Sequence, residues 1–120
     1  MKGTVRSADK GEYLAGTLSA QLGEELGDRF SWVVVQDMAV DGAFEEAIRD
    51  VDGVCHISSP FHFNAVSPNE MIDPAVRGTL NVLNAANDAG RVKRVVLTSS
   101  VAAVVNPEPH SPREFTEEVR

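Results

Sequence analysis

The sequence is poor in the groups that build disulfides, metal centres and membrane spans. Its only cysteine is Cys55, so the chain forms no internal disulfide, and we expect this residue to be small, apolar and buried. His56, His62 and His110 have no zinc-ligand spacing, which argues against a metal site. No apolar run approaches the roughly 20 residues of a bilayer span, and Met1 is not followed by a signal-peptide core. These absences favour a reducing, cytoplasmic location without a membrane partner.

Positive charge is also scarce. The chain has 11 Lys and Arg against 18 Asp and Glu, which gives a formal net charge of −7. No Lys/Arg cluster offsets this balance, so we expect no nucleic-acid partner. The hydrophobic fraction of 42% and the length of 120 residues are ordinary for one folded domain.

Short runs rich in β-branched residues alternate with longer runs that have helical spacing. The predicted strands cover 2–6, 32–35, 54–57 and 92–97, and the second of them has the composition of a buried strand. The predicted helices lie between them, at 9–26, 41–51 and 68–89. This alternation predicts right-handed crossovers and a parallel, doubly wound α/β sheet. In that class ligands gather where the strands end, so the residues that follow each strand are the candidates for a site.

The predicted helices carry start and stop signals of unequal strength. Gly16 and Gly23 weaken the first helix, which leaves one helix or two short ones open. Asp41 is the expected N-cap of the second, and one face of that helix is lined by Phe44, Ala47, Ile48 and Val51. The third has a capping box from Ser67 to Glu70 and a stop at Gly90, with an apolar stripe of Ile72, Val76, Leu80 and Leu83.

The first two strands are followed by charged residues. Arg6 and Lys10 follow the first, where an arginine accommodates the 2′-phosphate of NADP; taken alone, they are solvated surface charges. Asp37 follows the second and offers an acceptor to an adenine amino group, with Met38 beside the ring; an ordinary turn fits equally well.

Small polar residues follow the other two strands. Ser58 and Ser59 allow a dinucleotide to approach the backbone, or form a polar turn. Ser100 can donate a hydrogen bond to a substrate carbonyl, or cap a turn or helix. His56, inside the third strand, is expected to be a hydrogen-bonded core residue rather than a catalytic base.

These segments combine into a family resemblance. In order and spacing, Val5-Arg6-Ser7, Gln36-Asp37-Met38, Asp52 to Phe61, Gly78 to Leu83 and Val95 to Ser100 resemble the extended short-chain dehydrogenase/reductases, within the NAD-dependent epimerase/dehydratase group. The branch is that of dihydroflavonol reductases and fungal NADPH-dependent methylglyoxal or aldehyde reductases. The resemblance implies NADP(H) as cofactor, hydride transfer to a ketone or aldehyde, and a small carbonyl compound as substrate.

The resemblance also implies roles for individual residues. Arg6 and Lys10 match the 2′-phosphate binders, and Asp37 and Met38 match the pair around adenine. Ser100, rather than Ser99, matches the catalytic serine. The segment Ile57, Ser58 and Ser59 matches the backbone beside the ribose and pyrophosphate, while Asn81 matches a structural polar position.

Two departures from the family pattern limit what the chain is expected to do. It has no Gly-x-x-Gly-x-x-Gly turn and no Tyr-x-x-x-Lys pair, since its only tyrosine, Tyr13, is followed four residues later by Thr17. We therefore expect a partial NADP-binding Rossmann domain at 1–105, without its first strand and the C-terminal substrate region, and an irregular tail at 106–120. Without the intervening strand, 2–6 and 54–57 have unpaired edges, which predicts marginal stability unless they pair with each other. A non-catalytic nucleotide-binding or interaction fragment and a nonfunctional remnant are the alternatives.

Overall fold

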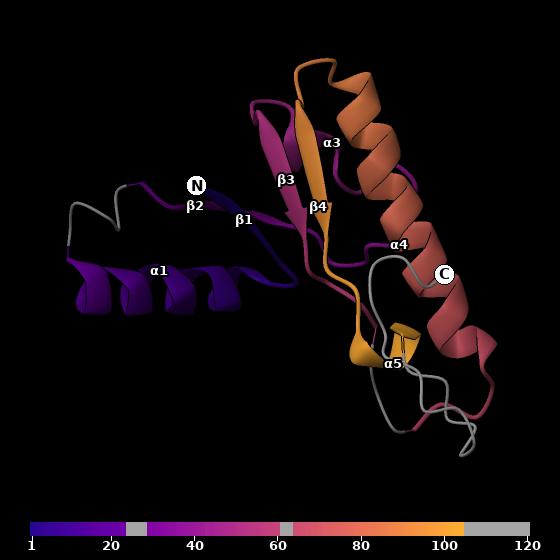
Figure 1. Ribbon diagram of the computed structural model, residues 1–120. Coiled ribbons are helices and arrows are strands. Elements are labelled where there is room, and N and C mark those ends of the chain that lie inside the picture. The colour runs from indigo at the N-terminus through magenta and orange to yellow at the C-terminus, as the bar shows by residue number, and fades with distance from the viewer. Residues whose placement is uncertain (24–28, 61–63, 105–120) are drawn as a thin grey trace.

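The fold alternates strands and helices as the sequence predicts (Figure 1). The computed structural model describes residues 1–23, 29–60 and 64–104. The elements in order are β1 (Lys2–Val5), α1 (Ala8–Leu22), β2 (Ser31–Val34), α3 (Glu45–Ile48), β3 (Gly53–His56), α4 (Asn69–Asp88), β4 (Arg94–Leu97) and α5 (Val101–Val104). The tail predicted at 106–120 lies outside the described residues, as do the last residues of the helix predicted at 9–26.

The four strands of the described residues form two parallel pairs rather than one continuous sheet. β1 pairs with β2, with Val5 beside Val34, and β3 pairs with β4, with His56 beside Leu97. Within the described residues no ladder joins β1 to β3, and a cavity of about 160 Å³ is lined by residues of both. The sequence predicts unpaired edges for β1 and β3 unless these two strands pair with each other, and in the structure they do not pair.

Helix α1 packs on its sheet through a glycine. It is one continuous helix that passes through Gly16 and ends at Gly23, whose φ of 85° lies in the left-handed region. Gly11 is the one residue of α1 that is buried, and a Cβ placed there would lie 2.3 Å from the Trp32 ring. The apolar spacing that predicts the helix does not mark a buried face, because Tyr13 is 74% exposed.

The hydrophobic core lies between α3, α4 and the second sheet. Its buried members are Val35, Phe44, Ile48, Val82, Ala85 and Ala86. His56 is also buried, and its ring meets that of Phe44 edge to face at a centroid distance of 6.4 Å. The predicted core position of His56 is confirmed, although the described contacts of its ring include no hydrogen bond. Burial lowers the pKa of His56 because it disfavours the charged imidazolium.

Helix α4 begins and ends close to the predicted positions but buries another face. The Ser67 hydroxyl accepts from the Asn69 amide at 3.4 Å, and the Glu70 carboxylate accepts from the Val66 amide at 3.3 Å. Gly90 follows the helix with a φ of 66°, as a C-terminal stop requires. The stripe of Ile72, Val76, Leu80 and Leu83 is exposed, whereas the buried residues are Gly78, Val82, Ala85 and Ala86.

Three predictions of burial and capping are wrong. Cys55 is exposed rather than buried, because side chains alternate along a strand and only the face that carries Val54 and His56 meets the core. The strand predicted as buried at 32–35 has Val34 39% exposed, since its sheet is two strands wide and partly uncovered. Asp41 is not the N-cap of α3: residues 41–44 form turns, and Phe44 occupies the cap.

Candidate functional site

A cleft of about 320 Å³ opens where β1, β2 and β3 end. The residues that line it are Thr4, Val5, Arg6, Val35, Gln36, Asp37, Met38, Phe44, Ser58, Ser59, Pro60 and Pro74. The carboxyl ends of parallel strands share an edge, which is where an α/β sheet binds its ligands. The volume lies at the lower end of the range for small-molecule sites, enough for part of a nucleotide.

The cationic side of the cleft is Arg6, which directly follows β1. Its side chain is exposed, and among the ion pairs of the described residues none uses Arg6 or Lys10. The guanidinium fork is therefore available to a phosphate. Lys10 lies in the first turn of α1, exposed, and is not among the residues that line the cleft.

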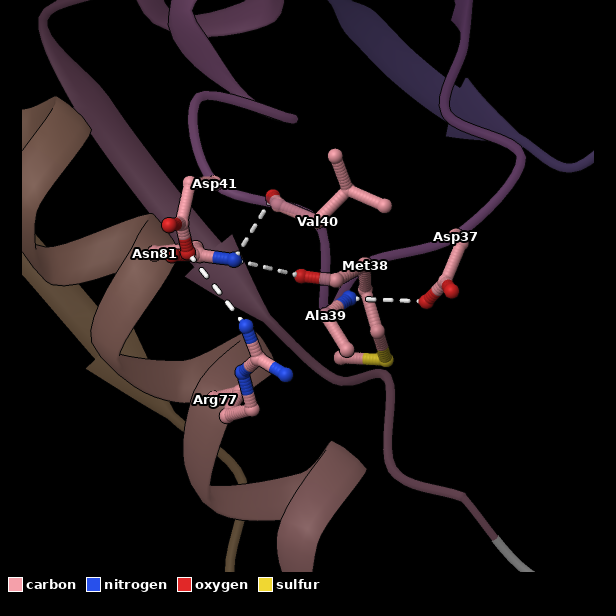
Figure 2. Close-up of polar contacts among 7 residues, drawn as sticks. All are labelled: Asp37, Met38, Ala39, Val40, Asp41, Arg77 and Asn81. Carbon is pink, nitrogen blue, oxygen red and sulfur yellow. Dashed lines mark hydrogen bonds and ion pairs between the residues drawn. The ribbon is translucent and has the colours of Figure 1, made fainter.

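Asp37 and Met38 lie side by side after β2. One carboxylate oxygen of Asp37 accepts from the Ala39 amide at 2.8 Å, so the interpretation as a turn residue holds (Figure 2). Its second oxygen makes no hydrogen bond to a described residue, which leaves an acceptor at the cleft. Met38 is half-buried, with its side chain against Gly78 of α4.

The serines that follow β3 and β4 emerge at the same edge. His56 pairs with Leu97, and the Thr98 amide donates to the His56 carbonyl at 3.0 Å, so the parallel register continues beyond both strands. Ser59 and Ser100 each lie three residues past that pair. Ser100 directly precedes α5, and its carbonyl accepts from the Ala103 amide at 2.9 Å, which also fits the interpretation as a helix cap.

Three of the predicted site residues, Lys10, Ser100 and Ile57, lie away from the cleft lining. Ser100 stands at the same sheet edge but is not among the lining residues, and Ile57 is 68% exposed and lines the cavity between the two sheets instead. Within the described part of the chain, no group of three His, Cys, Asp or Glu could hold a metal ion. No helix of that part is long and apolar enough to cross a bilayer.

Helix α4, which carries none of the residues predicted to bind cofactor or substrate, also contributes to the site. Pro74 lines the cleft directly, and Asn81 donates to the carbonyls of Met38 and Val40 at 2.9 and 2.8 Å. The available signal was an asparagine three positions after a glycine on α4, which is weak because the helix also carries Asn69, Asn84 and Asn87.

Comparison with known proteins agrees with this arrangement. The model of the 3-beta hydroxysteroid dehydrogenase/isomerase family matches residues 3–117. The ketoreductase azaE of Aspergillus niger is 46% identical over 120 residues, covering 95% of this chain and 34% of the relative. Aldehyde reductase 2 of Sporidiobolus salmonicolor is 39% identical over 110 residues, covering 92% of this chain and 31% of the relative.

Solved structures give the same result. The yeast methylglyoxal/isovaleraldehyde reductase Gre2, complexed with NADPH, aligns with a TM-score of 0.74 at 32% identity, covering 88% of this chain and 31% of that one. Gre2 of Candida albicans, also in complex with NADPH, aligns with a TM-score of 0.72 at 36% identity, covering 87% and 30%. The chain therefore spans about a third of the length of these relatives. It belongs to the 3-beta hydroxysteroid dehydrogenase/isomerase family of extended short-chain dehydrogenase/reductases, in the branch of the methylglyoxal reductases.

Proposed function

We propose that the cleft binds the adenosine 2′-phosphate half of NADP(H), as part of a reductase that converts a small ketone or aldehyde to an alcohol. One observation carries the proposal: Arg6, Asp37 and Ser59, from the ends of three separate strands, line the same cleft. Relatives named as a ketoreductase and an aldehyde reductase, and NADPH complexes of similar structures, support it.

The lining residues match the chemistry of that half of the cofactor. A guanidinium at Arg6 suits the 2′-phosphate, for which it offers charged, paired donors. The second carboxylate oxygen of Asp37 suits the adenine amino group, and the thioether of Met38 suits the face of the ring. Ser58 and Ser59 are small enough to let the cofactor lie close to the backbone.

The chemical step would take place beside Ser100. When bound, NADPH supplies the hydride. The Ser100 hydroxyl would donate a hydrogen bond to the substrate carbonyl oxygen and stabilise the negative charge that grows on it. Its register beside Ser59 supports this role, because it puts the hydroxyl-bearing residue at the same edge as the cleft.

A second function is nucleotide binding without turnover by this chain. It is favoured by the absence from the sequence of a Tyr-x-x-x-Lys pair, which in this family protonates the product. Addition of a small ketone to the chain with NADPH separates the two functions. Only a reductase oxidises NADPH, so only then does the NADPH absorbance fall at a rate that depends on the ketone concentration.

Calorimetric titration of the 120-residue chain with NADP⁺ and NAD⁺ tests the binding proposal. We expect NADP⁺ to bind at least about tenfold more tightly, since one charge-assisted contact is worth that much. Arg6→Ala should abolish this preference. Arg49→Ala is the matched control, because Arg49 is also exposed but lies at the end of α3, away from the cleft. Equal affinities in the wild type, or a preference that survives Arg6→Ala, would reject the proposal.

A further inference from the structure

The hydrogen bonds inside the loop that carries Asp37 and Met38 are all local. The Ala39 amide donates to the Asp37 carboxylate, the Val40 amide donates to the Asp37 carbonyl at 3.5 Å, and the Ala43 amide donates to the Val40 carbonyl at 3.1 Å. Asp37 and Val40 themselves are exposed. Local hydrogen bonds of this kind fix the shape of single turns. They do not fix the position of the loop relative to the rest of the cleft, which depends on other contacts.

Those contacts come from α4. The side-chain amide of Asn81 donates to the Met38 carbonyl at 2.9 Å and to the Val40 carbonyl at 2.8 Å, across more than 40 residues of sequence (Figure 2). A primary amide has two donor hydrogens, and its nitrogen meets two acceptors here. The reverse orientation would put the amide oxygen against two carbonyl oxygens, so the direction of the contact is fixed.

Gly78, almost one turn earlier on α4, makes room for the Met38 side chain. A Cβ at Gly78 would lie 2.4 Å from the terminal methyl of Met38 and 2.9 Å from its Cγ. The backbone of Met38 is thus held by Asn81 while its side chain rests on Gly78. The ion pair between Arg77 and Asp41, at 3.7 Å, is exposed and adds little.

We propose that Asn81 is a positioning residue that fixes the position of Asp37 and Met38 relative to Arg6 in the cleft. It thereby determines the preference for adenine over other bases. This inference rests on the proposed function. Asn81 is not among the cleft-lining residues, so it acts through the loop and not by contact with the nucleotide. Without its donors the loop keeps its local turns but loses its attachment to α4, and the Asp37 acceptor no longer has a fixed place beside the base.

The test compares 2′,5′-ADP with its hypoxanthine counterpart, inosine 2′,5′-bisphosphate, by calorimetry on the 120-residue chain. The second nucleotide has the same phosphates but lacks the amino group. We expect the wild type to prefer 2′,5′-ADP about tenfold, the effect of one hydrogen bond to a charged acceptor. Asn81→Asp, of nearly the same shape but without donors, should lower this ratio to near one. Asn81→Gln, which retains the amide, should restore part of it.

Controls keep a change of loop position distinct from a general loss of structure. Arg77 lies four residues before Asn81 on α4, about one turn away. Arg77→Ala should keep the ratio within about twofold of the wild type. Asn81→Ala removes the same donors without adding a charge, and it provides the same measurement if Asn81→Asp does not fold. An unchanged ratio in Asn81→Asp or Asn81→Ala overturns the inference.

The wild type separates this inference from the proposed function. If it binds 2′,5′-ADP more tightly than 5′-AMP but shows no preference over the inosine compound, the 2′-phosphate site stands and the role of Asn81 is overturned. If it does not bind 2′,5′-ADP more tightly than 5′-AMP, the proposed function fails and the inference fails with it.

Discussion

The β1–α1–β2 unit and the β3–α4–β4 unit have the same connectivity and parallel pairing, but they bury their helices to different extents (Figure 1). Helix α1 buries Gly11 alone, whereas α4 buries Gly78, Val82, Ala85 and Ala86. The hydrophobic core therefore lies in the second unit and in the segment before it, which supplies Val35, Phe44 and Ile48. The difference shows that a correct βαβ pattern does not ensure a packed helix: the neighbouring elements decide it.

The candidate site crosses the boundary between these units. Arg6 and Asp37 come from the ends of β1 and β2, and Ser59 from the end of β3. In the described residues no strand ladder joins β1 to β3. Side-chain contacts connect the two sides instead, among them the core packing of Val35 and Phe44 and the hydrogen bonds of Asn81 to the 38–40 loop. A change that loosens either unit should thus weaken nucleotide binding as well.

The largest expected effect comes from a charge in the core of the second unit. Val82 is 2% exposed, so Val82→Asp buries a carboxylate without a partner and should cost about 4 kcal/mol or more. The corresponding change on α1, Tyr13→Asp, replaces a residue that is 74% exposed and should cost less than about 1 kcal/mol. Urea denaturation followed by circular dichroism measures both. Similar losses in the two variants would remove the distinction between the units.

A smaller effect tests the single close contact of the first unit. Gly11→Ala puts a methyl group into the Trp32 ring and should destabilise the chain by about 1–3 kcal/mol. Gly16→Ala, in the same helix, meets nothing within 4 Å and should stabilise it by roughly 0.5–1 kcal/mol. Opposite signs in the two variants are expected by thermal or urea denaturation. A stabilising Gly11→Ala would mean that α1 does not pack on Trp32 in solution.

The sequence predicts the elements better than it predicts their burial. Each of the four strands lies within two residues of its predicted range, because β-branched runs and flanking turns are local signals. Burial of Cys55 and exposure of Leu80 depend on which neighbours cover each face, and periodicity does not report that. The positions of Arg6 and Asp37 at one cleft followed from the rule for parallel strands, whereas the contact of Asn81 with a loop 41 residues away needed the tertiary structure.

The smallest expected effect is a pH dependence that arises from the core of the second unit. Burial holds the pKa of His56 below its ordinary value of 6.5, so near that pH the unfolded chain binds more protons at this residue than the folded chain. The stability linked to His56 is thus fully present above pH 6.5 and is lost as the pH falls from 6.5 toward the folded-state pKa. Urea midpoints of the wild type should fall across this interval more steeply than those of His56→Gln, which cannot take up a proton. Because the other titrating groups are common to both proteins, the difference between the two curves isolates His56, and parallel curves would show that its ring is hydrated in solution.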